Sequence, residues 1–467
     1  MSQIEKNFGE TTGQTKQAPA GPGYSDEESV DLDSVDHAYT DEERALLRKL
    51  DWKIVLWLFV LYFLSVEDRV NVGFAMTMNT EQGHDLMAVA GLSPRQNNLG
   101  LALFYVAYII CELPSNLIMT RINPGLWIAR IMTTWGVVTA CMATIHSDWS
   151  FYLLRVLLGA LEAGFWPGMG TCTLAGVPSE ISSRIGSYYL AAPLSGAFGG
   201  LISAGIQLMD TDGGLLFLFS GLISIIFGVI TIWYLPSTPT HTPKHFPFLT
   251  QSERALATTR LAHSTAPSKS WTARDLVPPL SDPKTYLFSI LYFTPVMAAT
   301  SLGYFIPKIV QQMGTFTSIQ VSLISIPPYA FGGIVVTVAT KLSDHCRQRG
   351  LFIIACAISA VIGFVVLSFA DPLGASMAWT ANTSQTPLAI AITTSIVSSL
   401  ANFGALICTF ALYSGWPADA PRYIGSNMIN GGAMLLAAAT AGYLKWDLGR
   451  QNRKMDREGV VGMRFIL

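Results

Sequence analysis

The stretch YFLSVEDRVNVGFA, residues 62–75, places Glu67, Asp68 and Arg69 side by side inside a long apolar run. The rest of the chain is also apolar: 51% of its 467 residues are hydrophobic and only 13% are charged, against about 25% charged in a typical soluble domain. This composition excludes a soluble enzyme. A charge at the centre of a membrane helix costs about 2.5–3.5 kcal/mol on insertion scales. Three adjacent charges therefore need a polar cavity or partners around them.

Apolar runs of about 20 residues recur along the chain, and each is long enough to cross a hydrocarbon core about 30 Å thick. A polar, proline-rich connection at residues 236–284 divides them into two groups, as expected for a linker between two halves. The sequence predicts an all-α membrane protein with bundles at 51–235 and 285–447. The predicted spans are 53–75, 96–119, 126–145, 149–173, 183–207, 215–235, 285–307, 318–340, 351–370, 387–413 and 426–446.

The termini and loops predict the orientation of these spans. Residues 1–50 hold 11 Asp and Glu against 5 Lys and Arg, a polar composition typical of a disordered tail. Lys and Arg gather in the breaks after even-numbered spans, so the N-terminus is predicted to be cytoplasmic. The basic tail at 448–467 should then also be cytoplasmic. Eleven spans would place it on the opposite side, which indicates that one span is missing.

Several stretches resemble the anion:cation symporters of the major facilitator superfamily, especially the fungal branch with allantoate and nicotinate permeases. The resemblance implies twelve helices in two six-helix bundles around a central cavity. Only ADPLGAS separates span nine from the counterpart of the end of span ten, so this chain is predicted to lack the tenth span, leaving five in the C-terminal bundle. Glu67 and Phe74 depart from the usual apolar residue and Asn of the family. Besides 62–75, the matching stretches are 111–130, 155–168, 183–201, 304–314, 325–334, 341–350 and 413–425.

The fourth predicted span carries a second set of polar residues. Arg155, Gly159 and Glu162 fall at i, i+4 and i+7, which returns to one helix face. The resemblance implies that Arg69 and Arg155 bind the substrate anion and that Asp68 and Glu162 couple protons. An Arg guanidinium suits a carboxylate, which it can bind through two nitrogens. The alternative is that these four residues only form ion pairs that fix helix packing.

Other polar residues are weaker candidates. Glu67 is expected near a helix end or paired with a neighbour, since it lies nearly opposite Arg69. Glu112 is expected to pack near the cytoplasmic end of its helix. Asp344 is expected to be a gating-loop acid paired with Arg347 or Arg349. Aromatic residues at helical spacing are expected to pack or face lipid more often than to line a cavity; they are Tyr105, Tyr108, Phe165, Trp166 and Tyr304.

These features predict a secondary transporter, not an enzyme, that imports a small organic anion with protons by alternating access. The anion would be a carboxylate such as a vitamin or a nicotinate- or allantoate-like compound, and the membrane would be the plasma membrane. The alternatives are a proton-driven exporter of a fungal metabolite or drug, and a non-transporting sensor or inactive truncated remnant. The stretch PLSGAFGG, residues 193–200, lacks the Gly-Pro usual in exporters, which favours symport.

Partners other than the substrate, protons and lipid are not expected. The sequence contains no nucleotide-binding loop of the GxxxxGK[ST] type, so ATP is not expected to drive transport directly. The cysteines lack metal-ligand spacing, and the basic residues are scattered instead of forming one face. No cofactor, metal site, nucleic-acid contact or obligate protein partner is therefore predicted.

Overall fold

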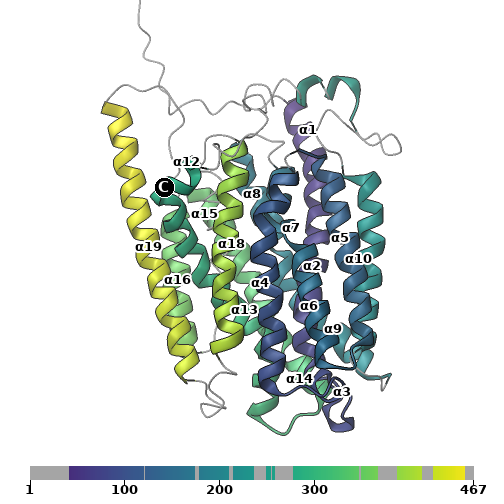
Figure 1. The fold of residues 1–467 in the computed structure, drawn as a ribbon. Coiled ribbons are helices and arrows are strands. Elements are labelled where there is room, and N and C mark those ends of the chain that lie inside the picture. Colours follow the sequence, from purple (N-terminus) through teal and green to yellow (C-terminus); the bar gives the residue numbers. More distant parts are fainter. Residues whose placement is uncertain are drawn as a thin grey trace, which may run out of the picture. The chain divides into compact units, whose positions relative to one another are not determined.

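The computed structural model describes residues 41–119, 121–173, 178–209, 214–235, 249–253, 255–257, 277–346, 349–366, 387–412 and 424–457. Within these residues every regular element is a helix (Figure 1). The chain divides into the units Met1–Arg44 and Ala45–Leu467. All the helices that could cross a membrane belong to the second unit.

The first group of helices follows the predicted spans, but two of these spans are divided. The predicted span 149–173 is not one helix, because α6 ends at Glu162 and α7 begins at Phe165. The predicted span 183–207 is divided between α8, which ends at Tyr189, and α9, which begins at Ala191. The elements are α1 (Asp41–Leu50), η2 (Asp51–Val55), α2 (Leu56–Ala75), η3 (Thr80–Gln82), α3 (Leu86–Val89), α4 (Pro94–Met119), α5 (Pro124–Cys141), η4 (Met142–Thr144), α6 (Asp148–Glu162), α7 (Phe165–Thr173), α8 (Pro178–Tyr189), α9 (Ala191–Gln207) and α10 (Gly214–Tyr234).

The second group begins after the polar connection. Its last helix extends through the first half of the predicted tail at 448–467, so that part of the tail is helical. The predicted deletion of the tenth span falls within residues 367–386, which lie outside the described part of the chain. The elements are α12 (Val277–Ser281), α13 (Pro283–Met313), α14 (Ser318–Ile324), α15 (Ile326–Cys346), α16 (Arg349–Val366), α18 (Pro387–Ala411) and α19 (Ile424–Arg457).

Seven helical stretches among the described residues are long and apolar enough to cross a membrane. The helix with the three adjacent charges, α2, is not one of them, since those charges reduce its apolar character. The seven stretches are Pro94–Met119, Pro124–Thr144, Arg184–Gln207, Gly214–Tyr234, Pro283–Gln312, Ser318–Thr340 and Thr393–Ala411.

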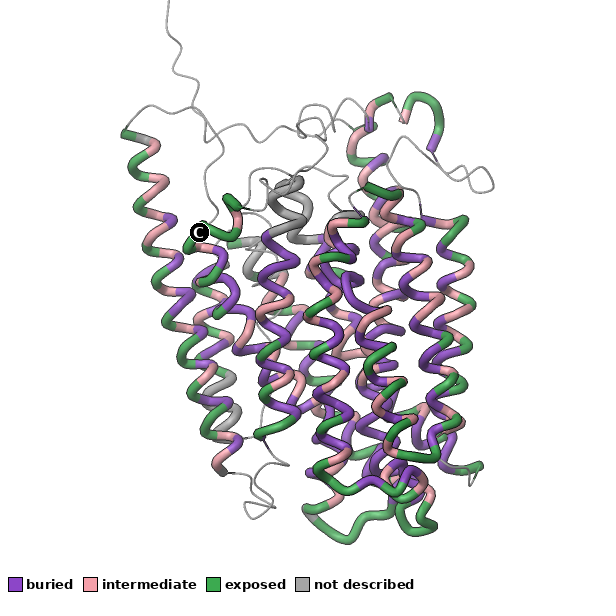
Figure 2. Tube along the Cα trace, viewed as in Figure 1, coloured by how far each residue is buried: buried purple, intermediate pink, exposed green. Residues whose placement is uncertain are grey.

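Large apolar side chains are exposed along the outer side of α10. They recur every three or four residues, so they lie along one stripe of the helix. Figure 2 shows exposed segments recurring along this helix. A continuous apolar surface of this kind indicates contact with lipid. The residues of the stripe are Leu218, Leu222, Ile226, Ile230 and Trp233.

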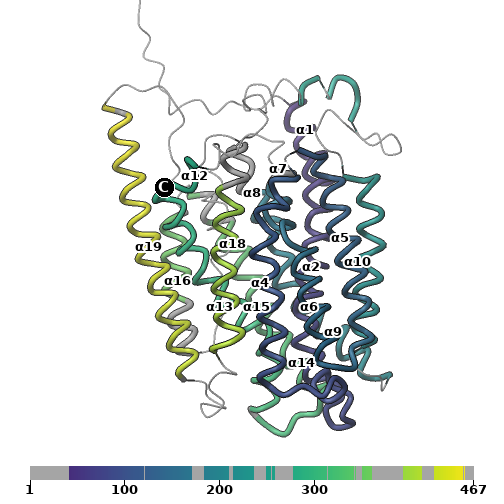
Figure 3. Tube along the Cα trace, in the orientation of Figure 1, coloured from purple at the N-terminus to yellow at the C-terminus, as the bar shows by residue number. Residues whose placement is uncertain are grey.

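Helices of the two groups pack against each other, among them α4 against α18, α2 against α13, and α9 against α14 and α15. Figure 3 shows α4 and α18 side by side although they are far apart in sequence. Small residues allow these approaches. A Cβ atom on Gly200 of α9 would lie 3.0 Å from the carbonyl oxygen of Ser322 in α14. A glycine at this position therefore lets α9 approach α14 closely.

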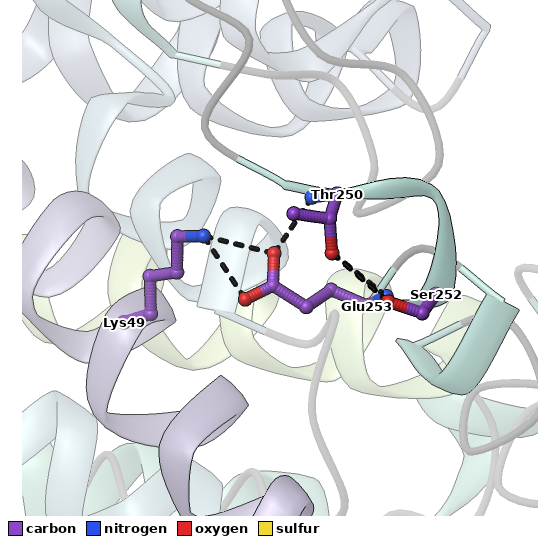
Figure 4. A network of polar contacts seen from close by, with 4 residues as sticks. All are labelled: Lys49, Thr250, Ser252 and Glu253. Atoms are coloured by element: carbon purple, nitrogen blue, oxygen red, sulfur yellow. Dashed lines mark hydrogen bonds and ion pairs between the residues drawn. The ribbon is translucent and has the colours of Figure 1, made fainter.

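The expectation of disorder throughout residues 1–50 is wrong for the end of that segment, which forms α1. Leu46 and Leu50 of this helix are buried together with Leu249 and Ala257 of the central connection. Lys49 donates to both carboxylate oxygens of Glu253, at 3.0 and 2.8 Å (Figure 4). The apolar contacts exclude water while the ion pair fixes the register of the two segments.

Thr250 and Glu253 begin the short helical turn of the central connection with a reciprocal capping arrangement. The backbone N–H of Thr250 donates to Glu253 Oε2 at 2.7 Å, and the backbone N–H of Glu253 donates to Thr250 Oγ1 at 3.3 Å. Such a box satisfies two backbone donors that would otherwise lack partners. The bond from Lys49, followed by that from the Thr250 N–H, holds the pKa of Glu253 below its ordinary value of 4.5.

Replacing Glu253 with Gln is expected to loosen α1 slightly. The pair is partly exposed, so its contribution is about 0.2–1 kcal/mol. Because the pKa of Glu253 is lowered, this stabilisation is present above the ordinary pKa and is lost as the pH falls through the lowered one. Amide exchange of residues 45–50 should therefore be faster in Glu253→Gln than in the parent chain at pH 7, with the difference vanishing in acid. The exposed Glu42→Gln is the control, and equal exchange of Glu253→Gln and parent at pH 7 would contradict the assignment.

Candidate functional site

The three adjacent charges of α2 take three different partners. Successive residues of a helix point about 100° apart, so the side chains leave α2 in different directions. Glu67 accepts a hydrogen bond from Asn71 Nδ2 of the same helix at 2.7 Å. It is thus paired with a neighbour, as expected.

Asp68 points toward α5 and α10. Its Oδ2 atom accepts hydrogen bonds from Trp135 Nε1 at 2.8 Å and from Ser224 Oγ at 2.9 Å. Its Oδ1 atom has no hydrogen-bond partner among the described residues. Asp68 and Arg69 therefore bond to different helices although they are adjacent in the sequence.

Arg69 forms an ion pair with Glu162, the last residue of α6. Its Nε and Nη2 atoms lie 2.8 and 2.7 Å from Glu162 Oε1, and Ser65 Oγ donates to the same oxygen at 2.9 Å. Three donors on one buried oxygen make a strong, charge-assisted arrangement. The Glu162 side chain is 3% exposed whereas that of Arg69 is 26% exposed. Arg69 is therefore the more exposed partner of this pair.

The break between α6 and α7 places Glu162 at this position. Ala163 leaves the helical conformation, and Gly164 has φ +88°, a value that L side chains rarely adopt. A Cβ atom on Gly164 would lie 2.5 Å from Ser115 Oγ of α4. The sequence signal for this break is GFWPG, residues 164–168, because Gly and Pro interrupt helices.

Arg155 is fully buried and faces α4, on the same side of α6 as Gly159. Its Nε atom makes one long hydrogen bond, 3.4 Å, to the Gly100 carbonyl oxygen, and its guanidinium carbon lies 4.6 Å from the centroid of the Phe104 ring. Nη1 and Nη2 have no hydrogen-bond partner among the described residues. Arg155 and Glu162 are both buried, but Arg155 does not join the Arg69–Glu162 pair.

Two aromatic rings lie close to the Arg69 guanidinium. The guanidinium carbon of Arg69 lies 5.6 Å from the ring centroid of Phe104 and 5.2 Å from that of Tyr108, distances at which a cation is attracted to a ring face. Phe104 therefore has a guanidinium near it from Arg69 and another from Arg155. The Tyr105 hydroxyl donates to that of Tyr304 at 3.3 Å, which links α4 to α13.

The aromatic residues singled out in the sequence are all buried, so none of them faces lipid. Trp166 packs against Tyr62, Tyr188 and Tyr189. The buried residues are Tyr105, Tyr108, Phe165, Trp166 and Tyr304.

Glu112 is buried at the contact between α4 and α18. Its Oε2 atom accepts a hydrogen bond from Ser399 Oγ at 2.7 Å. Packing is the role that the sequence predicts for this residue, but a partner in the other half of the chain was not predicted. The available signal for a polar face on α18 was helical spacing, since Ser395, Ser398, Ser399 and Asn402 fall at i, i+3, i+4 and i+7.

The predicted gating residues stay predictions. Asp344 lies in the last turn of α15 and not in a loop, and its side chain is outside the described part of the structure. Arg347 is also outside the described residues. Within the described residues, no cluster of three His, Cys, Asp or Glu side chains could hold a metal ion.

The arrangement of membrane-length helices around buried charges is typical of a multi-pass transporter, and comparison with known sequences gives the family. The profile of the Major Facilitator Superfamily matches residues 58–440. The chain therefore belongs to the Major Facilitator Superfamily. It is a membrane transporter of small molecules and not an enzyme.

Transporters from fungi and bacteria are similar to this chain. Vitamin H transporter 1 of Schizosaccharomyces pombe is 32% identical, over 83% of this chain and 78% of that protein. A putative tartrate transporter of Agrobacterium vitis is 32% identical, over 76% and 79%. The putative metabolite transport protein NicT of Pseudomonas putida is 31% identical, over 79% and 81%.

Solved structures share the fold at low sequence identity. The human organic anion transporter MFSD10 (TETRAN) has a TM-score of 0.59 at 13% identity, covering 84% of this chain and 99% of that one. A bacterial homolog of the human lysosomal transporter Spinster has a TM-score of 0.55 at 15% identity, covering 87% and 97%. These similarities confirm the predicted major facilitator fold.

Proposed function

We propose that this transporter imports a small organic carboxylate together with protons, by alternating access of bundles at 51–235 and 285–447. The observation that supports it most is the Arg69–Glu162 pair. A partly exposed guanidinium is held by a buried carboxylate through two nitrogens. A substrate carboxylate has the same chemistry as the Glu162 side chain and can take its place at Arg69.

Competition between the two carboxylates couples the anion to the proton. When Glu162 is ionised, it occupies the Nε and Nη2 donors of Arg69, which are then not available to a solute. When Glu162 takes up a proton, its attraction for Arg69 falls and the Nε and Nη2 donors become available to the substrate. Leaving the cation unpaired in a mostly buried site is costly. The favoured states are therefore ionised Glu162 without substrate, or protonated Glu162 with substrate.

Asp68 and Arg155 are proposed to assist the same exchange. Asp68 is the second proton carrier, because it is buried and one of its oxygens has no partner among the described residues. Arg155 is the second anion contact, because two of its buried nitrogens likewise have no partner there. Ionised groups in this condition are destabilised unless a proton or counter-ion arrives.

The carboxylate class is supported by one of the relatives. Tartrate, named for the Agrobacterium vitis relative, is a small dicarboxylate. The anion:cation symporter branch remains our proposal, as do the plasma-membrane location, the cytoplasmic N-terminus, and gating by Asp344 and Arg347. Lys and Arg in the breaks after even-numbered spans support the proposed orientation.

The proposal is tested by measuring uptake of labelled carboxylates into cells that express the chain. The panel should contain mono- and dicarboxylates and, for each, an uncharged amide of similar size. We expect at least one carboxylate to accumulate only with an inward proton gradient, whereas its amide should not. Uptake that favours the amide, or that is unaffected by collapse of the gradient, would contradict the proposal.

A further inference from the structure

Glu112 is a buried carboxyl that the proposed exchange at Arg69 does not use. It lies on α4, in the half of the chain that carries Arg69 and Glu162, and its side chain has no exposed surface. Its partner Ser399 lies on α18, 287 residues later and in the other half. The bond therefore connects the two halves directly.

The α18 face opposite Glu112 is polar. Ser398 and Asn402 also lie close to the Glu112 carboxyl. They come one residue before and three residues after Ser399. Asn402 Nδ2 donates to the backbone carbonyl oxygen of Ser398 at 3.0 Å. The α18 groups next to Glu112 are thus hydroxyl and amide groups. None of them is a cation.

We propose that Glu112 is a positioning residue for transport: its bond with Ser399 holds α4 against α18 in this conformation and must break for the two halves to separate there. This inference rests on the alternating-access part of the proposed function. A hydroxyl bond to a buried carboxyl stabilises the closed contact, because separation of the partners leaves polar groups without hydrogen bonds until water enters. Alternating access requires such contacts to form and break in each cycle.

The position of Glu112 also connects this contact to the anion site. Tyr108 lies one helical turn earlier on α4, and its ring is 5.2 Å from the Arg69 guanidinium carbon. The charge of Arg69 acts on Glu112 as well as on Tyr108. A change of partner at Arg69 therefore changes the electrostatic potential at the carboxyl that holds α4 to α18.

Cys408 provides a probe of this contact. It is fully buried on α18, near Tyr105 of α4. Separation of α4 from α18 would expose its thiol to a maleimide. The experiment uses the full chain in vesicles, with Cys408 as the one cysteine kept of the chain's 6, and measures its labelling rate without substrate and without a proton gradient.

Ser399→Ala and Glu112→Ala are each expected to raise the labelling rate about fivefold, the ratio for a bond worth about 1 kcal/mol. The double variant should be no faster than Glu112→Ala alone, because both changes remove one interaction. Glu112→Gln keeps an acceptor for Ser399 and should label within about twofold of the parent. Ser289→Ala is the control, since that hydroxyl donates to the Thr285 carbonyl of its own helix.

Additive effects of the two alanine changes, or unchanged labelling in Ser399→Ala, would overturn the proposal. Ser399→Ala removes a single hydroxyl, so it keeps the test valid if Glu112→Ala fails to fold. Labelling of Cys408 requires neither substrate nor proton, so it can succeed where the carboxylate proposal fails. Conversely, gradient-driven uptake with unchanged Cys408 labelling would reject this role of Glu112 and leave the carboxylate proposal standing.

Discussion

Arg69→Ala should reduce carboxylate uptake at least about thirtyfold while leaving the protein in the membrane. Truncating one partner of a buried, hydrogen-bonded charge pair costs about 2–5 kcal/mol, and each 1.4 kcal/mol is a factor of ten. Arg69→Lys should be nearly as damaging. A lysine ammonium cannot place two planar donors where Nε and Nη2 of Arg69 contact one carboxylate oxygen.

Arg130→Ala is the matched control for this change. The Arg130 guanidinium stacks over the Trp127 ring at 3.9 Å, away from the proposed site, so uptake should stay within about twofold. Surface labelling of the intact cells would show that all variants reach the membrane. Unchanged uptake by Arg69→Ala would remove Arg69 from the binding site.

Glu162→Gln should lose gradient-driven accumulation but retain exchange of labelled for unlabelled substrate. Glutamine keeps an oxygen that can accept the hydrogen bonds of Arg69 and Ser65, but it cannot take up or release a proton. The substrate should therefore equilibrate across the membrane without being concentrated. The measurement is the ratio of internal to external label, with and without an imposed pH difference, together with the exchange rate.

Glu67→Gln is the control for the coupling role of Glu162. Glu67 is a buried carboxyl on α2 that bonds Asn71 of its own helix, so its loss should leave accumulation intact. If Glu162→Gln loses exchange and accumulation to the same extent, the residue has a packing role only.

The fold was largely predictable from the sequence because membrane helices leave long apolar runs. The positions of Arg155 and Gly159 on one face of α6 also followed from helical spacing. The break after Glu162 was not predicted, although Gly164 and Pro167 carry the local signal, because the apolar run continues on both sides. The mean hydropathy of a membrane-length segment does not reveal that one of its residues has a positive φ.

The partners of the charges could not be predicted from local spacing. Asp68 is bonded by Trp135 and Ser224, which are 67 and 156 residues away. Which helix each charge faces depends on how α2 is rotated against its neighbours, and three adjacent residues span about 200° of the helix circumference. The sequence could predict that these charges need partners, but not which side chains supply them.

The missing tenth span remains a prediction. It concerns the interval between Val366, where α16 ends, and Pro387, where α18 begins. In the described residues, α16 packs against α19, and α18 packs against α13 and α4. We expect a bundle without the tenth helix to lack one wall of its cavity, and therefore to fold and transport less well than a twelve-helix relative.

Simultaneous recording of proton and substrate movement tests the central claim most directly. The labelled carboxylate would be added outside vesicles that contain the purified protein, without any imposed pH difference. A dye inside the vesicles would report the internal pH. We predict that the interior acidifies as the anion enters, and that this acidification is absent with Glu162→Gln although exchange persists. Anion entry without acidification in the parent protein would contradict proton-coupled import.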